Sequence, residues 1–136
     1  MSNDDAVSAE IEVEAPIDSV YAMFTDPAQL VRWIGIRAML EPRAGGRFRF
    51  ELMPGEFCSG RYVELDPPRR VVFTWGWESG ALPVVPGSST VTVELSTTPT
   101  GTHLQLTHAG LSKSMRDHHA GGWANFLPKL KEAAEA

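Results

Sequence analysis

A strand with three aromatic rings on one face follows the turn Asp66-Pro67-Pro68. Two successive prolines cannot donate hydrogen bonds to a sheet, so the strand begins after them. Side chains alternate along a strand, which places Phe73, Trp75 and Trp77 on the same face. These rings provide more apolar area than one strand needs. The pattern therefore indicates either a thick core or a hollow one.

The length and charge of the chain narrow its class. Its 136 residues predict a single domain over residues 1–136. The net charge of −5 argues against binding to nucleic acid or to an anionic membrane surface. The polar start of the chain predicts neither a signal peptide nor membrane insertion, and a cytoplasmic location is expected. With Cys58 as the one cysteine, no intrachain disulfide can form.

The order of elements predicts the fold class α+β. Apolar and polar residues alternate over residues 7–14, 48–52, 57–65, 71–77, 91–95 and 104–108, and residues 36–40 form a further short stretch with a weak pattern. Together they predict six to seven strands. Two short helices follow the first strand: Pro16 opens one, Asp26 caps the other, and Gly35 ends it. A long amphipathic helix spans Met115 to Glu135. Short connections make the sheet antiparallel, and it must curve around the one long helix that can cover it.

Several motifs in this order resemble those of one superfamily. They are Thr25-Asp26-Pro27 with Leu30 and Trp33, Gly45-Gly46-Arg47-Phe48, the segment 66–75, Ser89-Thr90-Val91-Thr92-Val93, residues 106–111, and His119 with Gly122-Trp123. The chain resembles the START-like (SRPBCC, helix-grip, Bet v-type) superfamily, and within it the bacterial AHSA-type proteins, homologues of the activator of the ATPase of the ninety-kilodalton heat-shock protein. The resemblance implies a curved sheet that grips the last helix, with a cavity between them that often takes apolar small molecules. It does not define an activity.

The faces that point inward in this prediction form a candidate pocket. Aromatic walls with a few polar groups are typical of small-molecule sites, although aromatics at this spacing also occur in a plain core. The predicted ligand-binding residues are Trp33, Phe48, Phe50, Phe57, Arg61, Phe73, Trp75, His108, Met115, His119 and Trp123. The same faces also carry Val63, Trp77, Leu104, Leu106 and Phe126.

Three polar residues of this set could carry chemistry. Arg61 shares a face with Phe57, and a buried guanidinium needs an acid, a ligand carboxylate or an opening to water. The alternative is that Arg61 reaches the rim. His108 and His119 either are satisfied core histidines or orient a ligand or act as acid and base. Catalytic residues are otherwise unknown from the sequence.

Other kinds of site find little support. His118 and His119 point about 100° apart on a helix, so they cannot share one metal ion, and we expect no metal and no cofactor. Cys58 is expected on the solvent face, with no base beside it. No glycine-rich phosphate loop is present.

Three functions are consistent with these features. The first is a carrier or sensor for an apolar small molecule, lipid-like or polyketide-like. The second is an enzyme of the cyclase, dehydratase or hydrolase type that uses the same cavity. The third is a chaperone-accessory protein. A homodimer and a chaperone partner both stay open.

Overall fold

The computed structural model describes residues 6–136, so residues 1–5 of the expected domain lie outside it. Along the chain the elements are β1 (Val7–Val13), α1 (Ile17–Ala22), α2 (Pro27–Leu30), β2 (Arg37–Leu40), β3 (Arg47–Met53), β4 (Glu56–Asp66), β5 (Arg70–Trp75), β6 (Ser89–Thr98), β7 (Gly101–Ala109) and α3 (Lys113–Glu135). The strands form one antiparallel sheet in the order β1-β7-β6-β5-β4-β3-β2. This architecture confirms the predicted fold class.

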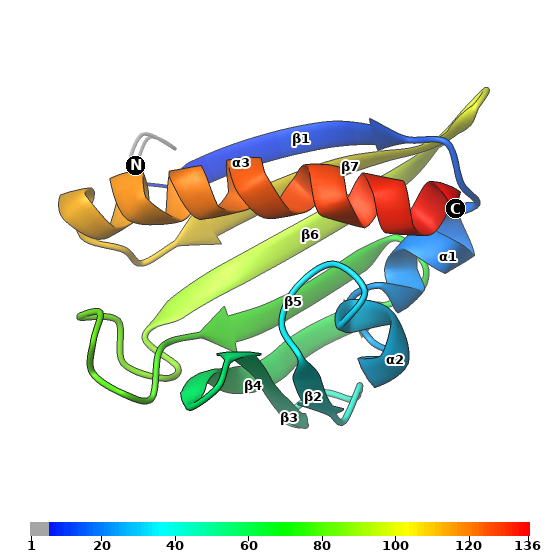
Figure 1. The fold of residues 1–136 in the computed structure, drawn as a ribbon. Helices are drawn as coiled ribbons and strands as arrows, with labels where there is room; N and C mark the ends of the chain where they lie inside the picture. Colours follow the sequence, from blue (N-terminus) through cyan, green and yellow to red (C-terminus); the bar gives the residue numbers. More distant parts are fainter. Residues whose placement is uncertain (1–5) are drawn as a thin grey trace.

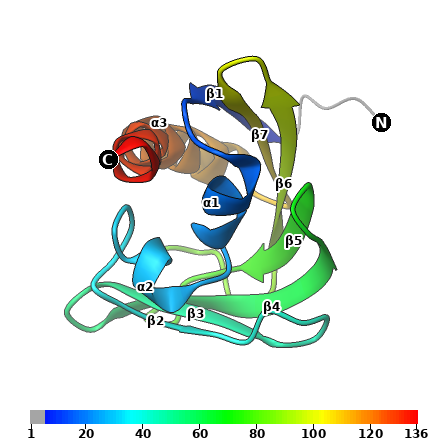
Figure 2. The same cartoon turned by 90° about the vertical axis from the view of Figure 1, so that its right-hand side faces the viewer.

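The sheet curves around α3. Figure 1 shows α3 running along the sheet beside β1 and β7, and Figure 2 shows the strands wrapping around the helix and around α1 and α2. Because α3 covers mainly the β1 side, α1, α2 and the segments that follow them cover much of the rest. The concave face of the sheet therefore receives side chains from three separate helices.

The predicted helix signals act as expected. The Asp26 carboxylate accepts a hydrogen bond from the backbone N–H of Ala28 at 2.9 Å, with Pro27 as the first residue of α2. Gly35 has a φ of +81°, a conformation that other residues rarely adopt, and ends this segment. Ser112 caps α3 by accepting from the N–H of Met115.

The core is built from aromatic rings on neighbouring strands. Phe48 of β3 and Phe73 of β5 stack with ring centroids 4.1 Å apart. Tyr62 of β4 meets both rings edge-on and donates its hydroxyl to the carbonyl of Phe24 at 2.7 Å. The buried hydroxyl is therefore not left unpaired, and its hydrogen bond ties the sheet to the end of α1.

The predicted orientation of β4 is wrong. Cys58 and Tyr62 are buried, whereas Arg61 is exposed and Val63 is 53% exposed. The register explains the reversal: Cys58 pairs with Phe50 and Gly60 with Phe48, and directly opposed residues share a face. Phe57 consequently lies on the outer face, with the guanidinium of Arg49 3.9 Å from its ring centre.

Gly60 is required where β4 and β5 lie close together. A Cβ at this position would lie 2.0 Å from the carbonyl oxygen of Thr74, which is a backbone atom of β5 and cannot move away cheaply. The close approach of β4 and β5 thus depends on this glycine.

We expect Gly60→Ala to lower the free energy of unfolding by about 1–3 kcal/mol, because the strands must separate to admit the methyl group. Gly121→Ala in α3 is the control, since nothing lies within 4 Å of its Cβ position. That change should stabilise the protein by up to about 1 kcal/mol, the helix preference for alanine. Urea unfolding of both variants measures the difference, and equal stability of Gly60→Ala and the wild type would refute the packing argument.

Candidate functional site

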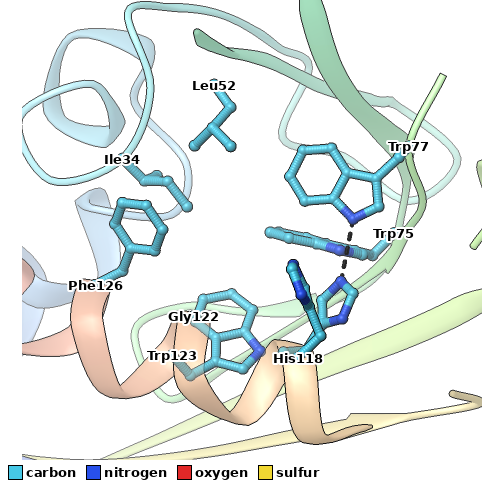
Figure 3. Close-up of a pocket in the computed structure, with 9 residues that line it drawn as sticks. Ile34, Leu52, Trp75, Trp77, His118, Gly122, Trp123 and Phe126 are labelled. Carbon is cyan, nitrogen blue, oxygen red and sulfur yellow. Dashed lines mark hydrogen bonds between the residues drawn. The ribbon is translucent and has the colours of Figure 1, made fainter. Parts of the chain in front are cut away.

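An apolar pocket of about 90 Å³ lies between the end of β5 and the middle of α3. Its lining residues are Ile34, Leu52, Trp75, Trp77, His118, His119, Gly122, Trp123 and Phe126. Figure 3 shows Ile34, Leu52 and Phe126 on one side of the space, facing Trp75 and Trp77 on the other, with Trp123 at the bottom. The pocket thus combines an aliphatic wall with an indole wall.

The indole wall is held by ring contacts and by one backbone bridge. Trp75 ends β5 and lies 5.6 Å from Trp77 and 5.2 Å from Trp123, measured between ring centroids. Trp77 lies beyond the strand but pairs with Cys58 of β4 through an isolated bridge. Trp77, which lies two residues after the end of the strand, is therefore still fixed against the sheet.

His119 holds Trp77 from the helix. The indole N–H of Trp77 donates to Nε2 of His119 at 3.1 Å, drawn as the dashed line in Figure 3. An indole nitrogen is only a donor, so Nε2 carries no proton and Nδ1–H donates to the carbonyl of Met115 at 2.8 Å. Both ring nitrogens of His119 are therefore occupied by the protein itself.

His108 holds Trp123 from the sheet in the same manner. The indole N–H of Trp123 donates to Nδ1 of His108 at 3.1 Å. The proton then lies on Nε2, which donates to the hydroxyl of Ser89 at 2.9 Å, and that hydroxyl donates to the carbonyl of Trp75 at 2.8 Å. The chain of bonds connects α3 with β7, β6 and β5.

Both histidines are neutral at physiological pH. Burial, and after it the charge of nearby His119, lowers the pKa of His108 to about 3. Burial also lowers the pKa of His119, against the opposing effect of its bond to the Met115 carbonyl. The ring centroids lie 5.2 Å apart, so a proton on either ring would also repel a proton on the other.

The structure brings together only part of the predicted site. Trp75, His119 and Trp123 line the pocket, as do Trp77 and Phe126 from the same predicted faces. Six further residues are buried but do not line it: Trp33, Phe48, Phe50, Phe73, His108 and Met115. His108 and Met115 still contribute by holding Trp123 and His119.

Two predicted site residues lie on the opposite face of the sheet. Arg61 is exposed, and its guanidinium donates to the carbonyl of Gly45 at 3.0 Å. Phe57 packs under Arg49. Neither can line a pocket on the concave face, and the prediction that they point inward is wrong. Cys58 is buried there instead, and burial raises its pKa, which makes the thiol unreactive.

Four lining residues were named neither among the predicted ligand-binding residues nor with Trp77 and Phe126 on the same predicted faces: Ile34, Leu52, His118 and Gly122. Gly122 lies on the predicted inward stripe of the last helix, and Leu52 continues the alternation of Phe48 and Phe50. These two could have been included from their spacing. Ile34 lies in the segment after α2, and His118 lies directly before His119 on α3. Their positions at the pocket depend on how these elements pack together, which periodicity does not define.

Within residues 6–136, no group of three His, Cys, Asp or Glu side chains is placed to hold a metal ion. Over the same residues, no helix has the length and apolar character needed to cross a membrane.

A family model described as Activator of Hsp90 ATPase homolog 1-like protein matches residues 14–135. Among solved structures, an AHSA1-like protein from Rhizobium etli is 36% identical, with a TM-score of 0.76 and coverage of 96% of this chain and 82% of that one. CalU16 from Micromonospora echinospora is 31% identical, with a TM-score of 0.74 and coverage of 95% and 74%. The Aha1 dimer from Colwellia psychrerythraea has the same fold, with 21% identity, a TM-score of 0.82 and 96% coverage of both chains. Among curated proteins, no sequence matches this chain.

We expect stability to fall as the pH drops below 6.5, the ordinary pKa of histidine. The unfolded state binds a proton that folded His108 excludes down to about pH 3, so protonation favours unfolding throughout that window. Between pH 7 and pH 5 this effect of His108 amounts to about 2 kcal/mol, with His119 acting in the same direction. Urea unfolding at the two pH values measures it.

His108→Asn is the matched variant, because its amide oxygen can accept from the Trp123 indole without titrating. Its stability should depend less steeply on pH than that of the wild type. A slope unchanged by this substitution would show that His108 does not exclude a proton in the folded state.

Proposed function

The chain belongs to the family of Activator of Hsp90 ATPase homolog 1-like proteins, and on that basis we propose that it binds an apolar small molecule in the pocket between Trp77 and α3. The family and the fold are compatible with two kinds of role, ligand binding and activation of an Hsp90-type ATPase. The observation that carries the proposal is the lining: three tryptophans, a phenylalanine and two aliphatic side chains around one space. Such a lining favours apolar ligands.

The size of the site supports a small ligand. The inner pocket of about 90 Å³ borders an outer hollow of about 410 Å³, and Ile34, Leu52 and Phe126 line both. Known ligand pockets occupy roughly 300–1,000 Å³. A ligand of that size would place a ring or alkyl end against the tryptophans and extend outward past Phe126.

One polar group in the lining supports selectivity. The indole N–H of Trp75 is buried and has no acceptor among residues 6–136. A buried donor without a partner costs about 1–3 kcal/mol. A ligand that carries an acceptor on its inner end could satisfy this group if the rings adjust, so we favour an apolar molecule with one inward carbonyl or ether oxygen.

Binding is better supported than catalysis. An acid or base must offer a nitrogen to the substrate and titrate near the working pH. Both nitrogens of His108 and of His119 are bonded within the protein, and the pKa of each is lowered. The histidines therefore serve to position tryptophans, which suits a carrier or sensor rather than a cyclase or hydrolase.

A chaperone-accessory role is the alternative that the family description suggests. Large exposed apolar side chains do occur, but they are distributed: Met39 and Val63 on β2 and β4, Val85 in a loop, Ile36 just before β2, and Met53 in the lining of the outer hollow. No single patch among residues 6–136 favours a protein partner over a ligand. Self-association, as in the Colwellia dimer, is a further proposal that analytical ultracentrifugation would test.

We expect the neutral probe N-phenylnaphthylamine to bind with micromolar affinity and to quench tryptophan fluorescence. Gly122→Leu should abolish binding, because the new side chain extends from a residue that lines the pocket. Gly121→Leu is the matched control on the exposed side of α3 and should bind like the wild type. Equal binding by both variants would place the probe elsewhere, and absence of binding by the wild type would favour the chaperone-accessory role.

A further inference from the structure

The outer hollow carries positive charge at an apolar mouth. Its lining residues are Val31, Arg32, Trp33, Ile34, Gly35, Leu52, Met53, Phe126 and Lys129. Two cations are present, and among residues 6–136 no Asp or Glu lines either this hollow or the inner pocket. The whole chain has a net charge of −5, so the charge at this mouth is opposite in sign to the net charge of the chain.

The guanidinium of Arg32 is already hydrogen-bonded within the protein. One arm of its guanidinium donates to the side-chain oxygen of Gln29 at 2.6 Å, and the other donates to the carbonyl of Ala133 at 2.7 Å. These bonds tie α2 to the end of α3. Arg32 therefore adds positive charge to the mouth, but most of its directed bonding capacity is in use.

Lys129 is the cation with free hydrogen-bonding capacity. Its ammonium lies 5.5 Å from the ring centroid of Phe126, and among residues 6–136 it makes no hydrogen bond or ion pair. The other lysine on the C-terminal half of α3, Lys131, is bonded to Glu135 and to the carbonyl of Glu12. Three donors on a flexible stem are thus available beside the wall that the two hollows share.

We propose that the ligand is an anionic amphiphile, and that Lys129 binds its carboxylate, phosphate or sulfonate head while the apolar end enters the inner pocket. This inference rests on the function proposed above and adds the charge of the ligand to it. Phe126 lines both spaces, as Figure 3 shows for the inner one, so a molecule that passes this ring lies against tryptophans at one end and beside Lys129 at the other. The same arrangement disfavours a cationic head group, because both charged groups at the mouth are positive.

A matched pair of probes separates charge from apolar contact. Anilinonaphthalene sulfonate has the ring system of N-phenylnaphthylamine with one sulfonate added, so only the head group differs. We expect Lys129→Met to weaken binding of the sulfonate roughly three- to tenfold, as for a partly exposed charged contact, and to leave the neutral probe unchanged. Lys113→Met, at the first residue of α3, is the control and should alter neither. Raising the salt concentration should weaken only the sulfonate, and only in proteins that retain Lys129.

The outcomes distinguish this inference from the proposal on which it rests. If Lys129→Met leaves both probes unchanged, or weakens both equally, the head-group role of Lys129 is wrong while ligand binding stands. If neither probe binds the wild-type protein, both proposals fail. Circular dichroism of Lys129→Met, an exposed substitution, confirms that the variant is folded before the affinities are compared.

Discussion

Two hydrogen bonds from tryptophan to neutral histidine determine the geometry of the concave face. The Trp77 and Trp123 indoles donate to His119 and His108, respectively. The one N–H of each histidine ring in turn donates a hydrogen bond to an oxygen of the protein. A large ring whose one polar atom is bonded has few orientations left. These bonds therefore fix two rings that would otherwise repack into the space between sheet and helix.

The pocket exists because the rings are held apart on different elements. Trp75 and Trp77 come from β5 and its continuation, Trp123 and Phe126 come from α3, and Ile34 comes from the segment after α2. The curvature of the sheet sets the distance between these elements, and within the sheet Gly60 permits the close approach of β4 to Thr74 of β5. If either indole moved to close the pocket, its buried hydrogen bond to histidine would break, and the cost of an unpaired buried donor opposes that movement.

The sequence predicts most of the fold because each signal acts locally. Alternation predicted the inward faces of β6 and β7, where Val91, Val93, Leu104 and Leu106 are all buried. It failed on β4 because the apolar Phe57 and Val63 were taken to mark the inner face. The charge of Arg61 on the same face, and Gly60 with Tyr62 on the other, favoured the reverse orientation. The register with Phe48 and Phe50 decides the face, and a register is a property of two strands that one strand's pattern does not contain.

The candidate site was harder to predict than the core. Period and composition placed the aromatic residues on the inner faces, correctly except for Phe57. Whether a ring lines the pocket or fills the core depends on distances between elements. The same limit applies to charge. Arg61 was predicted to be a ligand-binding residue, with a ligand carboxylate among its candidate partners, because its strand was assigned the wrong face. Lys129 became visible only when α3 and the segment after α2 were placed together.

Indole N–H resonances report on the central claim most directly, because the four tryptophans are in different surroundings. Trp75, Trp77 and Trp123 line the pocket, whereas Trp33 is bonded to the carbonyl of Met23 at 2.9 Å and lies outside the inner pocket. In a nitrogen–proton correlation spectrum, titration with N-phenylnaphthylamine should shift the three pocket indoles more than the indole of Trp33, which lines only the outer hollow. A titration that shifts none of the three, or shifts Trp33 alone, would contradict the account.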